Sequence, residues 1–112
     1  MMMLVFNMEY SWHMLFAKEM IEIAKRSKSK TAAYALLVAF EHIIDAYIAR
    51  GGKHFHEEYL ADAWKKRIEW MREHDILDRF DMLTCYCSKV IEGKEEYVYD
   101  MLTLIENMVI MD

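Results

Sequence analysis

The chain has 112 residues, 55% of them hydrophobic, with no proline and only three glycines. This length suits one domain with a single core, and the scarcity of helix-breaking residues favours long helices joined by short turns. The net charge of −5 is uneven: residues 1–72 carry 11 Lys and Arg against 9 Asp and Glu, and residues 73–112 carry 3 against 10. This balance excludes a generally basic nucleic-acid-binding protein but leaves room for a local basic patch.

The first predicted element is an apolar arm at residues 1–8, which packs on the domain or on a partner. The arm is too short to span a bilayer and lacks the basic region of a signal peptide, so we expect no membrane association. A helix over residues 9–26 follows. Its apolar residues recur at steps of three and four, and we expect them to face the core: Trp12, Leu15, Phe16, Met20 and Ile23.

The connection KRSKSK, residues 25–30, leads into a second helix over residues 30–50. This helix is apolar on most sides, which predicts a central place in a bundle or in a subunit interface. Glu41, His42 and Asp45 lie on its narrow polar stripe, at spacings of three and four residues. We expect this stripe to face solvent, with a contact across a dimer as the alternative.

Three further helices are predicted, over residues 56–73, 77–92 and 97–111, and Gly93 ends the second of them. No strand pattern competes with this interpretation. The expected fold class is therefore all-α, an up-and-down antiparallel four-helix bundle with an additional short helix or arm. Residues 1–112 are expected to form one helical-bundle domain.

Alternate turns of an up-and-down bundle share an end. We therefore expect KRSKSK beside REHD at residues 72–75, and RGGKHFH at residues 50–56 beside EGKEE at residues 92–96. His54 is a candidate binding residue in the RGGKHFH turn. The KRSKSK end offers candidate phosphate contacts, or alternatively a connection that is simply solvated: Lys25, Arg26, Lys28 and Lys30.

Metal sites find little support in the sequence. No glutamate is followed by a histidine three residues later, which argues against the di-iron centre of helical bundles. His54, His56 and Glu57 would need a loop to bring them together, so we expect no metal and no cofactor. Cys85 and Cys87 form a pair too short for a zinc knuckle, and we expect reduced thiols in a cytoplasmic protein.

Three overlapping or adjacent stretches carry a resemblance to a known family: HMLFAKEMIEIAKRSKSKTAAY, AAYALLVAFEHIIDAYIARGG and HFHEEYLADAW. The stretches contain, in this order, an opening helix, an Ala-rich helix with an internal acid, a Gly turn, and a His before an amphipathic helix. This order resembles the HEPN superfamily, small all-helical proteins common in prokaryotes, and its archaeal PaREP1-like relatives. The resemblance covers most of the chain.

The resemblance implies one of two functions. Some members are metal-independent ribonucleases with an Arg-x(4–6)-His motif at a dimer cleft. Others are non-catalytic modules that bind RNA, a nucleotide or a protein partner, often a small nucleotidyltransferase. The motif spacing is met twice here, by Arg50 with His56 and by Arg67 with His74.

Both matches depart from the family in the residue after the arginine. That residue is usually polar in the family, whereas here it is Gly51 or Ile68. We therefore expect a non-catalytic module that forms a homodimer. The alternative is a ribonuclease in which a histidine acts as general base or acid and an arginine stabilises charge on the phosphorane.

Overall fold

A computed structural model describes residues 2–51 and 60–110, and the side chains of residues 8–51 and 61–109. This part of the chain forms five α-helices. The helices are α1 (Met2–Lys25), α2 (Ser29–Arg50), α3 (Leu60–Glu73), α4 (Leu77–Ile91) and α5 (Tyr97–Ile110). Residues 2–51 and 60–110 contain no strand. The all-α prediction is confirmed.

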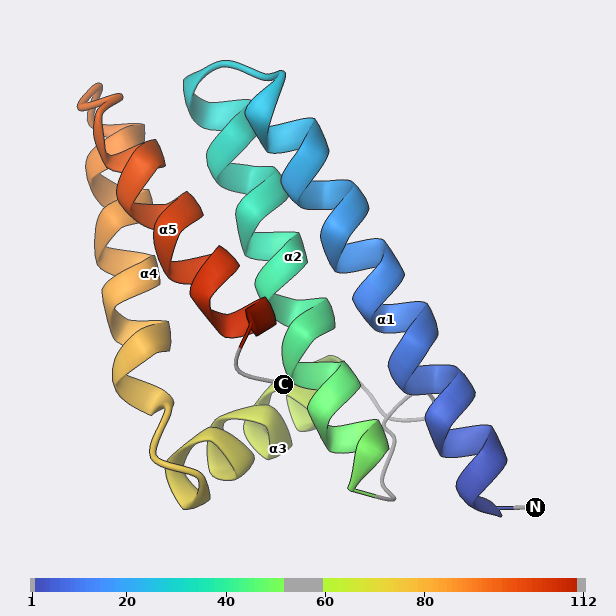
Figure 1. The fold of residues 1–112 in the computed structure, drawn as a ribbon. Helices are drawn as coiled ribbons and strands as arrows, with labels where there is room; N and C mark the ends of the chain where they lie inside the picture. The colour runs from blue at the N-terminus through green and yellow to red at the C-terminus, as the bar shows by residue number, and fades with distance from the viewer. Residues whose placement is uncertain (1, 52–59, 111–112) are drawn as a thin grey trace.

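Two antiparallel helix pairs lie side by side, α1 with α2 and α4 with α5, and the short α3 lies across their lower end (Figure 1). The α1–α2 pair packs most extensively of all the helix pairs. Alanines on both helices allow this close approach, because small side chains bring helix axes nearer. Those buried on α1 and α2 are Ala17, Ala24, Ala32, Ala33, Ala35, Ala39, Ala46 and Ala49.

α2 is the central helix, as the sequence predicts, because residues on most of its sides are buried. It is long and apolar enough to cross a membrane by length and composition alone, but most of that span is buried against other helices. Its large core residues pack with those of α3, α4 and α5. These fully buried side chains are Leu36, Phe40, Ile43, Ile44, Ile48, Met71, Leu83, Val90, Met101, Ile105 and Met108.

The face that α1 turns toward the core differs from the prediction. Met14, Ala17, Ile21 and Ala24 are buried, whereas Trp12, Leu15 and Phe16 are exposed by 52%, 59% and 39%. Met20 and Ile23 are partly buried against the core. α1 is apolar on two sides, and the periodicity of apolar residues does not distinguish the side that packs within the chain from the side that does not.

The start of the chain also differs in form from the expected arm. α1 begins at Met2, so residues 2–8 are its first turns, while residue 1 lies outside the described residues. The predicted start of the third helix, residues 56–59, likewise lies outside them.

At the end of α4, Gly93 has a φ of +103°, which glycine adopts without steric cost. The Gly93 and Lys94 amides donate to the Val90 and Lys89 carbonyls, so this glycine ends α4 in a Schellman motif.

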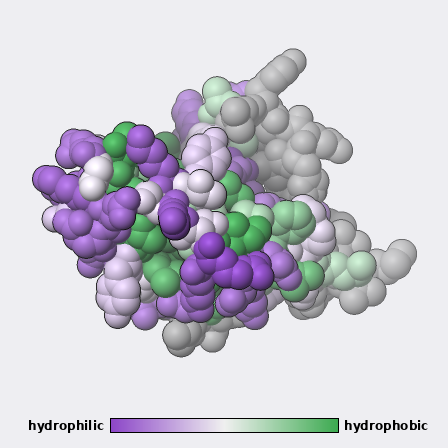
Figure 2. All heavy atoms as spheres, turned by 90° about the horizontal axis from the view of Figure 1, so that it is seen from above, coloured by the Kyte–Doolittle hydropathy of each residue, from purple (hydrophilic) through white to green (hydrophobic). Residues whose placement is uncertain are grey.

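The pairing of the turns is the reverse of the prediction. The α1–α2 turn lies beside the α4–α5 turn, where the Ser29 hydroxyl donates to Glu95 Oε1 over 2.5 Å. Figure 2 looks onto this end, where many of the exposed residues are hydrophilic. The α3–α4 turn lies at the other end of the molecule, near the end of α2. α3 lies across the helix pairs and does not run along their length. The α3–α4 and α4–α5 turns therefore lie at the ends opposite to those that the up-and-down prediction gave them.

The two thiols differ in their exposure. Cys85 is exposed and Cys87 is buried, and both are free. Burial raises the pKa of the Cys87 thiol, which keeps it in the unreactive neutral form.

Candidate functional site

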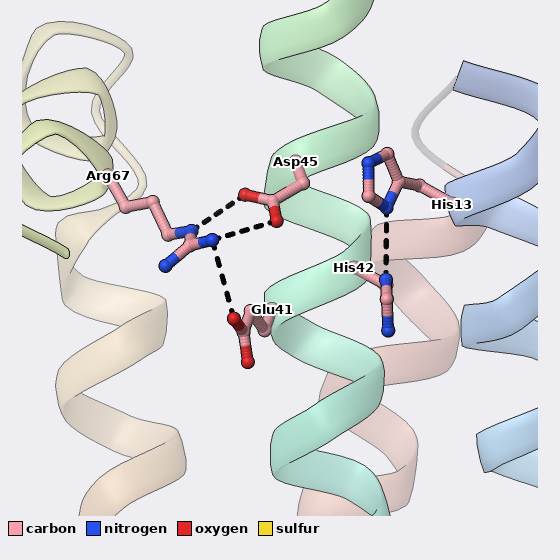
Figure 3. A network of polar contacts seen from close by, with 5 residues as sticks. All are labelled: His13, Glu41, His42, Asp45 and Arg67. Atoms are coloured by element: carbon pink, nitrogen blue, oxygen red, sulfur yellow. Dashed lines mark hydrogen bonds and ion pairs between the residues drawn. The ribbon is translucent and has the colours of Figure 1, made fainter. Parts of the chain in front are cut away.

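Two groups of polar side chains lie on either side of α2, one toward α3 and the other toward α1 (Figure 3). Arg67 of α3 donates from Nε to Asp45 Oδ1 over 2.7 Å and from Nη2 to Asp45 Oδ2 over 2.9 Å. The same Nη2 lies 3.3 Å from Glu41 Oε1. Arg67 is only 7% exposed, and its guanidinium lies 4.9 Å from the centre of the Trp64 ring. This bidentate pair fastens α3 to α2.

The prediction that Glu41, His42 and Asp45 form a solvent-facing stripe was wrong. The Asp45 side chain is 16% exposed and that of Glu41 is 34% exposed, and both face α3. His42 is half-buried and faces α1. α3 covers this side of α2 because it lies across the two helix pairs, a direction that the helical period of the sequence does not specify.

His42 forms a pair with His13 of α1, a residue that the sequence analysis did not single out. The two Nδ1 atoms are 3.0 Å apart, so one imidazole donates and the other accepts. The rings of Trp12 and Phe16 lie 5.9 Å and 5.0 Å from the His42 ring. No spacing in the sequence indicates this contact, because it joins two helices across 29 positions of the chain.

Burial lowers the pKa of His42, and the charge of Arg67 acts in the same direction, while Glu41 and Asp45 oppose it. The folded protein therefore favours neutral His42. As the pH falls, His42 of the unfolded chain is protonated at a higher pH than His42 of the folded protein. We expect the contribution of His42 to the free energy of unfolding to be constant above the usual histidine pKa of about 6.5 and to fall as the pH drops below it. Urea titrations at several pH values measure this dependence.

The matched variant for this pH dependence is His42→Gln, which keeps a polar side chain but has no proton to gain in this range. We expect its unfolding free energy to change less than that of the wild type between pH 7 and pH 5. An identical pH dependence in both proteins would show that His42 makes no contribution.

A hollow of about 380 Å³ opens at the end of the molecule where α2 ends and α3 turns into α4. It is lined by Tyr47, Arg50, Gly51, Trp70, His74 and Ile76. Its aromatic rings are stacked: Tyr47 and Trp70 are 6.3 Å apart with planes at 8°, and Trp70 and His74 are 4.1 Å apart at 20°. We call this feature the Arg50 hollow.

Arg50 lies beside these rings. Its guanidinium carbon is 4.8 Å from the centre of the Tyr10 ring and 5.2 Å from that of Tyr47. The His74 Nδ1 lies 2.8 Å from the Trp70 carbonyl oxygen, which fixes the orientation of the imidazole at the exposed end of α3. A neutral His74 therefore donates from Nδ1 and presents Nε2 as an acceptor.

The structure divides the two Arg–His pairs that the sequence suggested. Arg50 and His74 line the same hollow, although they come from different pairs. Arg67 is buried and paired with Asp45 and Glu41 of α2. His56, the expected partner of Arg50, lies outside the described residues, as does His54.

The basic residues of KRSKSK do not accompany His74. The α1–α2 turn lies beside the α4–α5 turn and opposite the Arg50 hollow, and it contains or adjoins all four basic residues: Lys25, Arg26, Lys28 and Lys30. Lys25 pairs with Glu22 at 3.5 Å and with Glu106 at 3.2 Å, and the hydrogen bond and charge of Glu106 raise its pKa. The expectation that these residues share an end with the Arg67–His74 pair was therefore wrong.

Comparison with family models, with curated proteins and with solved structures gave no match for this chain. Within residues 2–51 and 60–110, no group of three or more His, Cys, Asp or Glu side chains is placed to hold a metal ion. Two features of this part of the chain gather polar and aromatic side chains: the Arg50 hollow and the polar contacts made by α2.

Proposed function

We propose that the protein is a non-catalytic, HEPN-like helical module that binds RNA or a nucleotide in the Arg50 hollow. The observation that supports this most is the gathering of Arg50, Trp70 and His74 around one open space. Stacked rings offer apolar surface to a base, and a guanidinium pairs with a phosphate. In this proposal His74 Nε2 accepts a hydrogen bond from a base or ribose hydroxyl.

The state of Arg67 argues against catalysis by the Arg67–His74 pair. Its guanidinium is buried and engaged by Asp45 and Glu41, so it is not available to stabilise charge on a phosphorane. The ribonuclease alternative depends instead on Arg50 with His74. Both line the same hollow, and His74 has a ring nitrogen that can take a proton from a 2′-hydroxyl.

We also propose that α1, α2, α4 and α5 form an up-and-down bundle with α3 as the additional helix, and that two copies of the chain form a homodimer. The support for the dimer is the outer face of α1, which consists of Met8, Trp12, Leu15 and Phe16 and is exposed in a single chain. Its members recur at i, i+4, i+7 and i+8, so they form one continuous stripe.

A second copy fits the outer face of α1 better than a charged partner. α1 has 24 residues and is about 36 Å long, so two antiparallel copies can bury the same stripe from both sides. The exposed charges beside the stripe include both signs, Lys18 and Glu19, so the copies do not repel each other uniformly. We also propose a cytoplasmic location and a nucleotidyltransferase partner, and only the HEPN resemblance supports these two points.

RNA binding is tested by fluorescence anisotropy with a short labelled single-stranded RNA in excess EDTA. We expect Arg50→Ala to weaken binding by about tenfold, because it removes one cation from the site. The matched control is Arg26→Ala, which removes the same charge from an exposed position at the opposite end and should leave the affinity unchanged.

The same samples are examined for cleavage on a denaturing gel. Binding without cleavage by the wild type supports the non-catalytic proposal. Cleavage that persists in EDTA and disappears in His74→Ala would establish the ribonuclease alternative. The absence of both binding and cleavage, or equal affinities for Arg50→Ala and the wild type, would overturn the assignment of the Arg50 hollow.

A further inference from the structure

A second hollow of about 340 Å³ lies between α2, α3 and α4, and none of its described lining residues also lines the Arg50 hollow. Its walls are aromatic, from Tyr34, Phe40, Trp64 and Phe80, and its carboxylate comes from Glu41. Phe80 is stacked on Phe40 at 5.5 Å and on Trp64 at 5.8 Å, so three rings form a rigid wall. Tyr34 is 72% exposed and stands at the rim.

Two carboxylates beside this second hollow face the same described cation. Arg67 is the cation that faces both Asp45 and Glu41, so one guanidinium serves two carboxylates. Its shorter contacts, at 2.7 Å and 2.9 Å, go to Asp45, and its contact with Glu41 is 3.3 Å long. Glu41 therefore keeps negative charge at the edge of an aromatic wall, where it attracts a cation more strongly than it would in open water.

The same corner already holds one cation against an aromatic ring, since the Arg67 guanidinium lies 4.9 Å from the centre of the Trp64 ring. An aromatic enclosure with a partly exposed carboxylate is suited to an organic cation, whose charge is attracted by ring faces and whose body is apolar. The volume is within the range of small-molecule sites.

We propose that this second hollow binds a small organic cation, an ammonium group carried on an aromatic or aliphatic body. Glu41 pairs with the ammonium group. Phe80 and Trp64 contact the body, and Tyr34 covers it from the rim. This proposal does not rest on RNA binding in the Arg50 hollow, since the ligand has the opposite charge and the described lining residues of the two sites are all different.

The test compares 2-phenylethylamine, which is a cation at pH 7, with 2-phenylethanol, which is neutral and has nearly the same shape. Each is titrated into ¹⁵N-labelled protein, and the indole N–H of Trp64, assigned with Trp64→Phe, is followed by NMR. We expect the amine to shift this signal saturably and to bind about tenfold or more tightly than the alcohol. Equal affinities, or no saturable shift, would overturn the proposal.

Two variants locate the charge and the wall. Glu41→Gln keeps the two Arg67–Asp45 hydrogen bonds, so the fold is retained, and it should remove the preference for the amine. Glu19→Gln, which removes the same charge from an exposed position on α1, should not. Tyr34→Ala changes an exposed side chain and should weaken the binding of both compounds. An unchanged preference in Glu41→Gln would show that Glu41 is not the counter-charge.

Discussion

Replacing Arg67 with methionine is expected to lower the free energy of unfolding by about 3–5 kcal/mol, because it leaves carboxylates without their cation in a partly buried place. The Asp45 side chain is 16% exposed and accepts two hydrogen bonds from Arg67, so it loses both at once. Urea denaturation followed by circular dichroism measures the change. In the variant, α3 should also pack less firmly on α2, since Arg67 joins the two helices through two hydrogen bonds to Asp45 and an ion pair with Glu41.

The control for Arg67→Met is Arg26→Met, which alters an exposed arginine at the end of α1 and should change stability by no more than about 0.5 kcal/mol. The double variant Arg67→Met with Asp45→Leu should recover part of the loss, because the uncompensated charge is removed with its partner. If Arg67→Met were as stable as the wild type but no longer acted on RNA, Arg67 would belong to a catalytic site after all.

Replacing Leu15 with lysine is expected to weaken the proposed homodimer at least about a hundredfold, because a charge then lies unpaired in an apolar interface. Leu15 is 59% exposed in the single chain, so the fold of each copy should not change. Sedimentation velocity over a range of concentrations separates monomer from dimer. We expect the wild type to be dimeric at concentrations where Leu15→Lys is monomeric.

Tyr99→Lys is the matched control for the dimer, because Tyr99 is also a large exposed side chain but lies on α5. It should leave the dimer intact. Wild-type protein that stays monomeric at every concentration would contradict the proposal, and so would a dimer that tolerates Leu15→Lys.

The number of helices, the central place of α2 and the glycine that ends α4 follow from the sequence, since they depend on local signals. Apolar periodicity marks a helix, a helix that is apolar on most sides is buried, and Gly93 is suited to the left-handed backbone that it adopts. These features require no knowledge of which elements meet.

What the sequence did not indicate depends on how the helices cross. The direction of α3 decides that Arg67 is buried, that His74 joins Arg50, and that KRSKSK lies at the other end. Which apolar side of α1 packs within the chain depends on α2, and the His13–His42 contact depends on both. Spacing along one helix contains no information on a partner from another.

α3 has one property that links the two hollows. Among the described residues it packs less extensively than the other helices, and Arg67 joins it to α2 through Asp45 and Glu41. It also supplies Trp70 to one hollow and Trp64 to the other, and His74 of the first hollow follows directly after its last residue. If α3 detaches locally, as weakly packed segments do in hydrogen-exchange experiments, both hollows lose a wall together.

A ligand in either hollow would favour the attached state of α3. By thermodynamic linkage, a ligand in the first hollow would raise the affinity of the second hollow for its own ligand. The ligand of the second hollow would raise the affinity of the first by the same factor. The coupling would be large only if the detached state is appreciably populated. A short crossing helix would then make an anion site and a cation site cooperative, although the described residues that line them are all different.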